Sequence, residues 1–360
     1  MDARTRANDA LLLRWLSTPR DDLSAVRSVL GDVTDWVAFA QRAQKHGLGG
    51  TLHRSAIAAG ISLPDPLVAA WNERREAERA WRAKLVALTD EANGALAAAA
   101  IDAVVLKGAA LAERLYEEPS LRISTDVDLM IAERDFDRAV ASLTSLGFAI
   151  EGSATQAFHR KHHHHVLLER EDGIGIELHF RAFTGFGATI PSEPLLERSV
   201  AYRSRSGATL KVLEPNDEWL YLAAHAAGHL LERLSWMHDL KLYPGRIGPL
   251  DASVIESRAR EFGLERALAW TAWWLEGHRL PSPVRAAISP YQAGFAEWLR
   301  AATLRSPSRS FLQIGTVAFT GLLARDATSA SALIGRSAGR IAKRRVQRHL
   351  PRWVPEAWGG

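Results

Sequence analysis

The spacing of apolar residues changes along the chain, and each change marks a different kind of secondary structure. In residues 1–100, apolar side chains recur at helical intervals, as in Leu12, Trp15 and Leu16. Beyond Pro66 this region has no further proline and is rich in Ala, Glu, Arg and Leu, which predicts one long helix ending near residue 100. We therefore expect an N-terminal helical region over residues 1–100.

Residues 101–213 show a different pattern, in which apolar and polar residues alternate as they do in strands. An apolar run to Leu106 is followed by a turn and a helical stretch, then by a strand at 126–131 and a helix at 133–146. The runs 165–169 and 174–179 are joined by polar residues and Gly173, which indicates a hairpin, and 200–202 with 209–213 indicate a second one. Strands, helices and hairpins in this order predict an α+β core.

Helical spacing returns after residue 213. We expect a helical domain over residues 214–300 and a basic helical tail over 301–360. The tail holds ten Lys or Arg residues against Asp326 and Glu356, so its formal charge is +8. The whole chain has a net charge of +4, so the first 300 residues carry about −4. A weak anionic partner, either RNA or a lipid surface, is therefore a possible ligand of the segment Arg340–Leu350, although basic tails are often inert.

Composition narrows the class of protein. The chain has 360 residues, 47% of them hydrophobic, and no cysteine, so disulfides and thiolate metal sites are excluded. The first 16 residues lack the apolar core of a secretory signal, and the longest apolar run, 311–323, is too short for a transmembrane segment. We expect a cytoplasmic protein.

Three acidic residues stand on predicted strands. Asp126 and Asp128 are two residues apart and share one strand face, and Glu177 shares a face with His179 on a later strand. A neighbouring position for the two strands would gather three carboxylates, which are the hard oxygen ligands that Mg2+ prefers. Since the aspartates repel each other, we expect Asp128→Asn to leave the metal-free protein at least as stable as the wild type.

Three motifs occur in a fixed order along the chain: Leu106-Lys107-Gly108, then Arg122-x-x-x-Asp126-x-Asp128-Leu-Met, then Ile176-Glu177-Leu178-His179-Phe180. Their sequences and order resemble those of an uncharacterised bacterial nucleotidyltransferase family of the DNA polymerase β superfamily. The resemblance implies a polymerase-β-like mixed sheet core, flanked here by N-terminal and C-terminal helical regions. It also implies that Asp126, Asp128 and Glu177 are catalytic and hold Mg2+ or Mn2+.

One departure concerns the phosphate-binding turn. The wider superfamily has a Gly-Ser turn shortly before the aspartate pair, whereas this chain has Lys107-Gly108 further upstream. Phosphate binding would then rest on Lys107, on the helix N-terminus after Gly108, and on Arg122 and Ser124. Arg122 is equally suited to a structural carboxylate pair.

The activity that the resemblance implies is transfer of a nucleoside monophosphate from an NTP to an acceptor, with release of pyrophosphate. A small molecule, a peptide, a protein side chain and an RNA end all remain open as the acceptor. The alternative is a non-catalytic nucleotide-binding or adaptor protein on a degenerate nucleotidyltransferase fold, because the Gly-Ser turn is missing.

Histidines supply the remaining candidates. In the run His162–His165 only alternate members would share a strand face, so we expect a polar strand start rather than a metal site, with His165 and His179 lining the pocket. His225 and Asp239 match the family's helical-domain motif and are possible pocket residues. His225 with His229, and His238 with Asp239, could alternatively form a metal phosphohydrolase site, but further ligands are not apparent.

Overall fold

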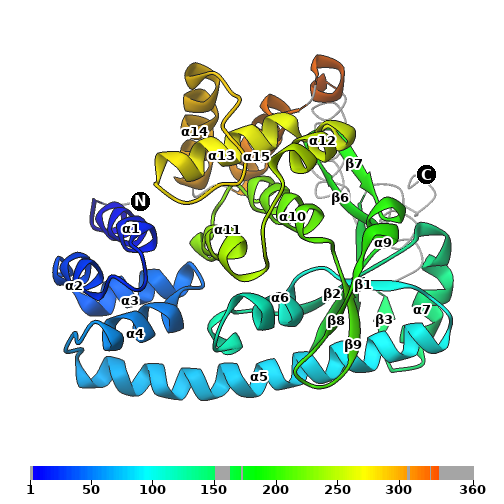
Figure 1. The fold of residues 1–360 in the computed structure, drawn as a ribbon, viewed down its shortest axis with the longest axis horizontal. Coiled ribbons are helices and arrows are strands. Elements are labelled where there is room, and N and C mark those ends of the chain that lie inside the picture. The colour runs from blue at the N-terminus through cyan, green and yellow to red at the C-terminus, as the bar shows by residue number, and fades with distance from the viewer. Residues whose placement is uncertain (1–2, 151–162, 172, 306–308, 325, 332–360) are drawn as a thin grey trace, which may run out of the picture.

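The computed structural model describes residues 3–150, 163–171, 173–305, 309–324 and 326–331, and within these ranges helices lie on both sides of a mixed sheet (Figure 1). The predicted α+β class is confirmed. None of the helices in the described ranges is long and apolar enough to cross a membrane.

The N-terminal region is helical, as the spacing of its apolar residues predicts. Its helices are α1 (Ala3–Ser17), α2 (Leu23–Gly31), α3 (Trp36–Lys45), α4 (Gly49–Ala58) and α5 (Asp65–Ala98). Aspartates begin two of them: the carboxylates of Asp22 and Asp35 each accept a 2.9 Å hydrogen bond from a first-turn N–H, which satisfies a donor that the helix leaves free.

Helix α5 is the long helix expected from residue 66 onward. It has 34 residues and is therefore roughly 50 Å long at the rise of an α-helix. It runs beneath the N-terminal helices and then beneath the sheet (Figure 1). Trp71 in its first half stacks on His53 of α4 with ring centroids 4.6 Å apart, whereas Leu85 and Leu96 in its second half join the core under the sheet. One helix thus contacts both parts of the molecule.

The main sheet has the strand order β3-β4-β5-β2-β1-β9-β8. Its strands are β1 (Ala103–Val105), β2 (Asp126–Ile131), β3 (Ala149–Ile150), β4 (His165–Glu169), β5 (Gly175–His179), β8 (Val200–Arg203) and β9 (Thr209–Val212). The two predicted hairpins, β4–β5 and β8–β9, are both present and antiparallel. The pairs β2–β5 and β1–β9 are parallel, so the sheet is mixed.

The two faces of the sheet lie against different cores. Val127, Leu129 and Ile131 of β2 join α5 and α7 (Phe136–Thr144) in one core, which includes Phe136. Met130 belongs to the other core, together with residues of α6 (Gly108–Leu115) and of the C-terminal helices. Because side chains alternate along a strand, the aspartates of β2 face this second side.

A second, two-stranded sheet was not expected from the sequence. It is a hairpin of β6 (Arg181–Gly185) and β7 (Ala188–Pro191), which follows β5 directly. Its two turn residues, Phe186 and Gly187, have φ values of +54° and +75°, the conformation of a type I′ turn. Phenylalanine rarely adopts this conformation, so the turn signal in the sequence is weak.

The chain after β9 is helical, with α10 (Pro215–Gly228), α11 (Leu234–Arg246), α12 (Ala252–Phe262), α13 (Glu265–Gly277), α14 (Pro290–Arg305) and α15 (Arg309–Leu322), whereas the short α9 (Glu193–Arg198) lies earlier, between β7 and β8. Helix α10 lies at the centre and is buried along most of its length. Since one hydrophobic core joins N-terminal helices, α6 and this region, the division into four regions stays a prediction. The basic segment Arg340–Leu350 lies outside the described residues.

Candidate active site

The parallel pairing of β2 with β5 sets three carboxylates on adjacent strands. In this register Asp128 lies opposite Glu177, and Asp126 precedes Asp128 by two residues on the same face. His179 follows Glu177 by two residues and shares its face. The structure therefore contains both the shared face and the neighbouring strand that the sequence pattern predicts.

The Lys107-Gly108 turn lies beside this cluster. It follows β1 and begins α6, and Lys107 Nζ is 2.8 Å from Asp128 Oδ1 and 4.0 Å from Glu177 Oε2. Gly108 has φ +61°, and a Cβ there would lie 3.6 Å from the carbonyl oxygen of Asp126. A turn that lies far upstream in the sequence thus contacts the start of the aspartate strand in space.

Two histidines complete the immediate surroundings of the carboxylates. His179 Nε2 lies 3.4 Å from Asp128 Oδ1 and 3.5 Å from Glu177 Oε2. His165 pairs with His179 in the β4–β5 register, and its Nε2 lies 3.9 Å from Glu177 Oε1. Both histidines lie where the sequence placed them, at the edge of the acidic cluster.

The two aspartates differ in their electrostatic surroundings. Burial, followed by the charge of Asp128, raises the pKa of Asp126 to about 6. Burial would also raise the pKa of Asp128, whose side chain is 1% exposed, but Lys107 and then His179 outweigh it and hold that pKa well below its usual range. Asp128 is therefore the stably ionised member of the pair, whereas the ionised form of Asp126 is unfavourable in the fold.

Among the described residues, Arg122 and Ser124 have no hydrogen bond or ion pair with the carboxylate cluster, although the charge of Asp128 contributes, after burial and Asp239, to the raised pKa of Arg122. Arg122 Nε donates to Asp239 Oδ2 at 3.0 Å, and its Nη1 donates to Ser124 Oγ at 3.0 Å and to the Gly108 carbonyl at 3.4 Å. Tyr116 donates to the other oxygen of Asp239 at 2.7 Å. We call this buried hydrogen-bond network of Arg122, Asp239, Tyr116 and Ser124 the Arg122 bracket. It favours the structural alternative for Arg122, and it holds the Gly108 turn in place.

Helix α10 faces the cluster from the side opposite α5. The charge of Lys107 contributes, after burial, to lowering the pKa of His225 and His229, and Asp128, Glu177 and Asp126 contribute, after burial, to raising that of Tyr221. The rings of Tyr221 and His225 stack with centroids 6.2 Å apart. Sequence reasoning missed Tyr221, although its spacing of four residues from His225 is a signal for one helix face.

The phosphohydrolase alternative finds no support in the described residues. His225 and His229 are neighbours, with ring centroids 4.6 Å apart, but His238 contacts Arg20 and the ring of Tyr116 instead. Asp239 is engaged by Arg122. Among the residues that the structure describes, none of these four side chains belongs to a group of three or more that could hold a metal ion.

The acidic cluster itself can hold a cation. Ligand atoms of Asp128, Glu177 and His179 lie within 4.8 Å of one another, and Asp126 adds a further carboxylate on the same strand face. Asp128 and Glu177 lie on either side of one ammonium group, that of Lys107, and Asp126 adds a third negative charge nearby, so the carboxylates outnumber the cation. The oxygen-rich donor set fits a divalent cation such as Mg2+ or Mn2+.

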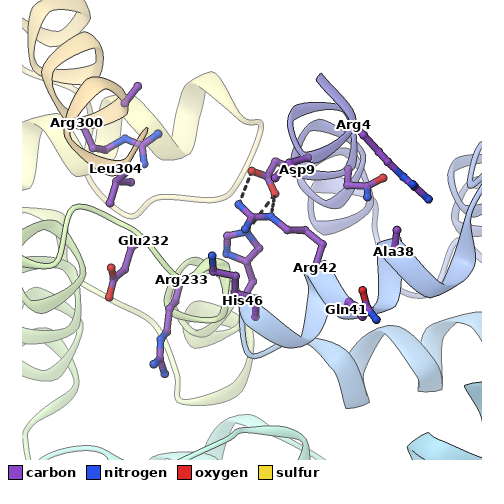
Figure 2. A pocket seen from close by; sticks show the side chains of 14 residues that line it. Arg4, Asp9, Ala38, Gln41, Arg42, His46, Glu232, Arg233, Arg300 and Leu304 are labelled. Carbon is purple, nitrogen blue, oxygen red and sulfur yellow. Dashed lines mark hydrogen bonds and ion pairs between the residues drawn. The ribbon is translucent and has the colours of Figure 1, made fainter. Parts of the chain in front are cut away.

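A separate cavity of about 890 Å3 lies between the N-terminal helices and α14 (Figure 2). Arg42 and His46 of its wall both contact Asp9, with the Arg42 Nη2–Asp9 Oδ2 distance 2.7 Å and the His46 Nε2–Asp9 Oδ1 distance 3.2 Å. Its lining includes none of the carboxylates or histidines described above. The cavity is therefore not part of the candidate active site.

The comparison with protein families agrees with the geometry. A family model described as "uncharacterised nucleotidyltransferase" matches residues 32–277, about two thirds of the chain, and this span includes every residue of the cluster. No curated protein matches the chain. Nucleotidyltransferases generally use divalent metals, which agrees with the donor set. Because the match covers well over half of the sequence, the chain belongs to the uncharacterised nucleotidyltransferase family.

Proposed function

We propose that the protein transfers a nucleoside monophosphate from an NTP to an acceptor and releases pyrophosphate, with Asp126, Asp128 and Glu177 holding a divalent cation. The observation that carries this proposal is the β2–β5 register, which sets the three carboxylates beside a helix-starting turn. A bound Mg2+ or Mn2+ would neutralise triphosphate charge and orient the phosphates.

Phosphate binding and proton transfer fall to residues of the chain itself. Backbone N–H groups at the start of α6 are free of helical partners and suit a phosphate, and Lys107 supplies a positive charge next to them. Glu177, whose side chain is 25% exposed, accepts the proton of the acceptor hydroxyl. The acceptor oxygen then bonds to the α-phosphorus, the bond to the bridging oxygen breaks, and pyrophosphate leaves.

The acceptor would approach from the side of α10. Tyr221 and His225 border the cluster there, and Asp239 supports the turn from behind through Arg122. This wall combines a buried aromatic face with histidine nitrogens, and it has no strong net charge. The acceptor class stays open among a small molecule, a peptide, a protein side chain and an RNA end.

The test is transfer of label from each α-32P-labelled NTP into fractions of a cell extract, with Mg2+ or Mn2+. We expect labelled product and pyrophosphate with the wild type and loss of both with Glu177→Gln. Glu171→Gln is the matched control, because it makes the same chemical change at an exposed position on the same hairpin. Full transfer by Glu177→Gln would contradict the proposed site. Metal-dependent NTP binding without any transfer would instead favour the non-catalytic alternative.

A further inference from the structure

The histidine run before β4 does not have the geometry that a regular strand would give it. His162 lies outside the described residues, His163 precedes the strand, the chain bends at His164, and β4 begins at His165. Because of this bend, consecutive residues approach the same point instead of pointing to opposite faces. The rings of His164 and His165 have centroids 4.6 Å apart, and each is near His179, at 5.4 Å and 4.9 Å.

Backbone hydrogen bonds hold the bend in place. The carbonyl oxygen of His164 accepts from Phe180 N at 3.0 Å and from Arg181 N at 3.2 Å, and Arg181 Nη1 donates to the His163 carbonyl at 3.2 Å. The ring of Phe183 lies 6.0 Å from that of His164 and provides an apolar side to the cluster. The imidazoles are thus positioned by the adjoining strands, as metal ligands usually are.

The nitrogens of this cluster lack ordinary partners. His179 is 2% exposed, and within the described part of the chain its Nδ1 makes no hydrogen bond, whereas its Nε2 faces Asp128 and Glu177 at 3.4 Å and 3.5 Å. The same holds for the buried Nδ1 of His165. Buried polar atoms are normally hydrogen-bonded, so two such nitrogens in one small cluster call for a ligand that the protein itself does not supply.

The ligand chemistry follows from the donor set. One nitrogen from each of His164, His165 and His179 lies within 4.8 Å of the others. Bonds of about 2.0–2.1 Å to a tetrahedral metal place its ligand atoms roughly 3.4 Å apart, so a small inward movement closes the site. Three imidazoles without an oxygen ligand suit Zn2+ and related transition metals, whereas Mg2+ prefers oxygen.

We propose that His164, His165 and His179 bind one Zn2+ ion per chain, at a site separate from the carboxylate site but joined to it through His179. Three protein nitrogens leave a fourth position for water or a ligand atom, which is the arrangement of catalytic rather than structural zinc sites. Glu177 and Asp128, at 3.5 Å and 3.4 Å from His179 Nε2, would orient that ring as neighbouring carboxylates do at other zinc sites.

Metal binding by the full-length protein tests this proposal without any nucleotide. After removal of metal by a chelator, we expect the wild type to take up one Zn2+ per chain in competition with a chromophoric chelator. With Co2+ as the spectroscopic probe, we expect the visible absorption of a tetrahedral site, unchanged by excess Mg2+. Neither signal depends on nucleotidyl transfer, so this proposal and the proposed function can fail separately.

The variant His164→Leu removes one ligand without touching a residue of the proposed transfer reaction. We expect its Zn2+ affinity to fall at least tenfold and its Co2+ absorption to weaken, while His278→Leu, on a distant helix end, behaves as the wild type. Asp128→Asn, which alters the carboxylate site, should keep the stoichiometry of one Zn2+. Unchanged Zn2+ affinity in His164→Leu, or no stoichiometric uptake by the wild type, would overturn the proposal.

If His164→Leu fails to fold, X-ray absorption of the zinc-loaded wild type decides. We expect the zinc shell to contain three imidazole nitrogens. A zinc shell with fewer than three imidazole nitrogens would refute the site.

Discussion

The two aspartates of β2 can be separated by replacing each with asparagine in metal-free protein. Asparagine keeps the size of the side chain and removes its charge, so the change in stability reports what that charge does in the fold. Asp126 has a raised pKa and Asp128 a lowered one. The two substitutions should therefore change the free energy of unfolding in opposite directions.

The gain expected for Asp126→Asn follows from its pKa. The folded-state pKa of about 6 lies well above 3.8, the ordinary value of an aspartate side chain. At about 1.4 kcal/mol per unit, ionised Asp126 costs the fold on the order of 3 kcal/mol above pH 7. Asn is also polar and buried, so we expect it to recover roughly 1–3 kcal/mol. Because the folded pKa is the higher one, the cost fades as pH falls through 6, to about half near pH 5.

The loss expected for Asp128→Asn follows from its partners. The substitution removes the carboxylate that lies 2.8 Å from Lys107 Nζ and leaves the ammonium, 15% exposed, with Glu177 at 4.0 Å. Breaking a buried ion pair costs roughly 3–5 kcal/mol, and the remaining carboxylate places this case near the lower end. The structure thus reverses the expectation that Asp128→Asn leaves the apo protein as stable as the wild type, because Lys107 more than offsets the repulsion from Asp126.

The assay is urea unfolding in EDTA at several pH values between 5 and 8, with the exposed Asp65→Asn as the control. At pH 8 we expect Asp126→Asn to be more stable than the wild type and Asp128→Asn to be less stable. The advantage of Asp126→Asn should shrink toward pH 5. Equal destabilisation by both variants at pH 8, or an advantage for Asp126→Asn that grows with acidity, would refute the electrostatic account.

Three further predictions follow from the same contacts. Lys107→Met should destabilise the EDTA-treated protein by about 3 kcal/mol, because it leaves the buried carboxylate of Asp128 with only His179 beside it. Added Mg2+ should raise the melting temperature of this variant more than that of the wild type. Gly108→Ala should lower the free energy of unfolding by about 1 kcal/mol, because there is room for a Cβ but the φ of +61° disfavours alanine. Denaturant unfolding measures this change, and an unchanged midpoint would contradict it. Asp239→Asn should lower the melting temperature and weaken NTP binding together, because Arg122 loses its partner while holding the Gly108 carbonyl; a variant with wild-type melting would show that the bracket is dispensable.

The elements that the sequence predicts best are those whose pattern reflects burial on one face. Alternation along β2 and β5 placed Asp126, Asp128 and Glu177 on one side, because a strand of period two admits no other arrangement. The long helix α5 was predictable from composition, since it has no proline beyond its first turn and is rich in Ala, Glu, Arg and Leu.

Other features depend on tertiary contacts that no local pattern encodes. Arg122 binds Asp239, which lies 117 positions further along the chain, and so its expected phosphate role could not be judged from neighbouring residues. The convergence of His164 with His165 depends on a bend held by β5 and β6, where strand periodicity predicts divergence. The hairpin at Phe186 was missed because its turn uses a residue that seldom adopts positive φ.

The length of α5 constrains how the protein can change. Its first half contacts the N-terminal helices through Trp71, and its second half contacts the sheet through Leu85 and Leu96. One inserted residue between these halves would rotate one set of contacts by about 100° relative to the other, whereas seven residues, nearly two full turns, would leave a rotation of only about 20°. Those seven residues would still move the two halves roughly 10 Å apart along the helix axis, away from the core that the N-terminal helices share with α6 and the C-terminal helices. Helix α5 therefore fixes both the phase and the spacing between the two parts of the molecule.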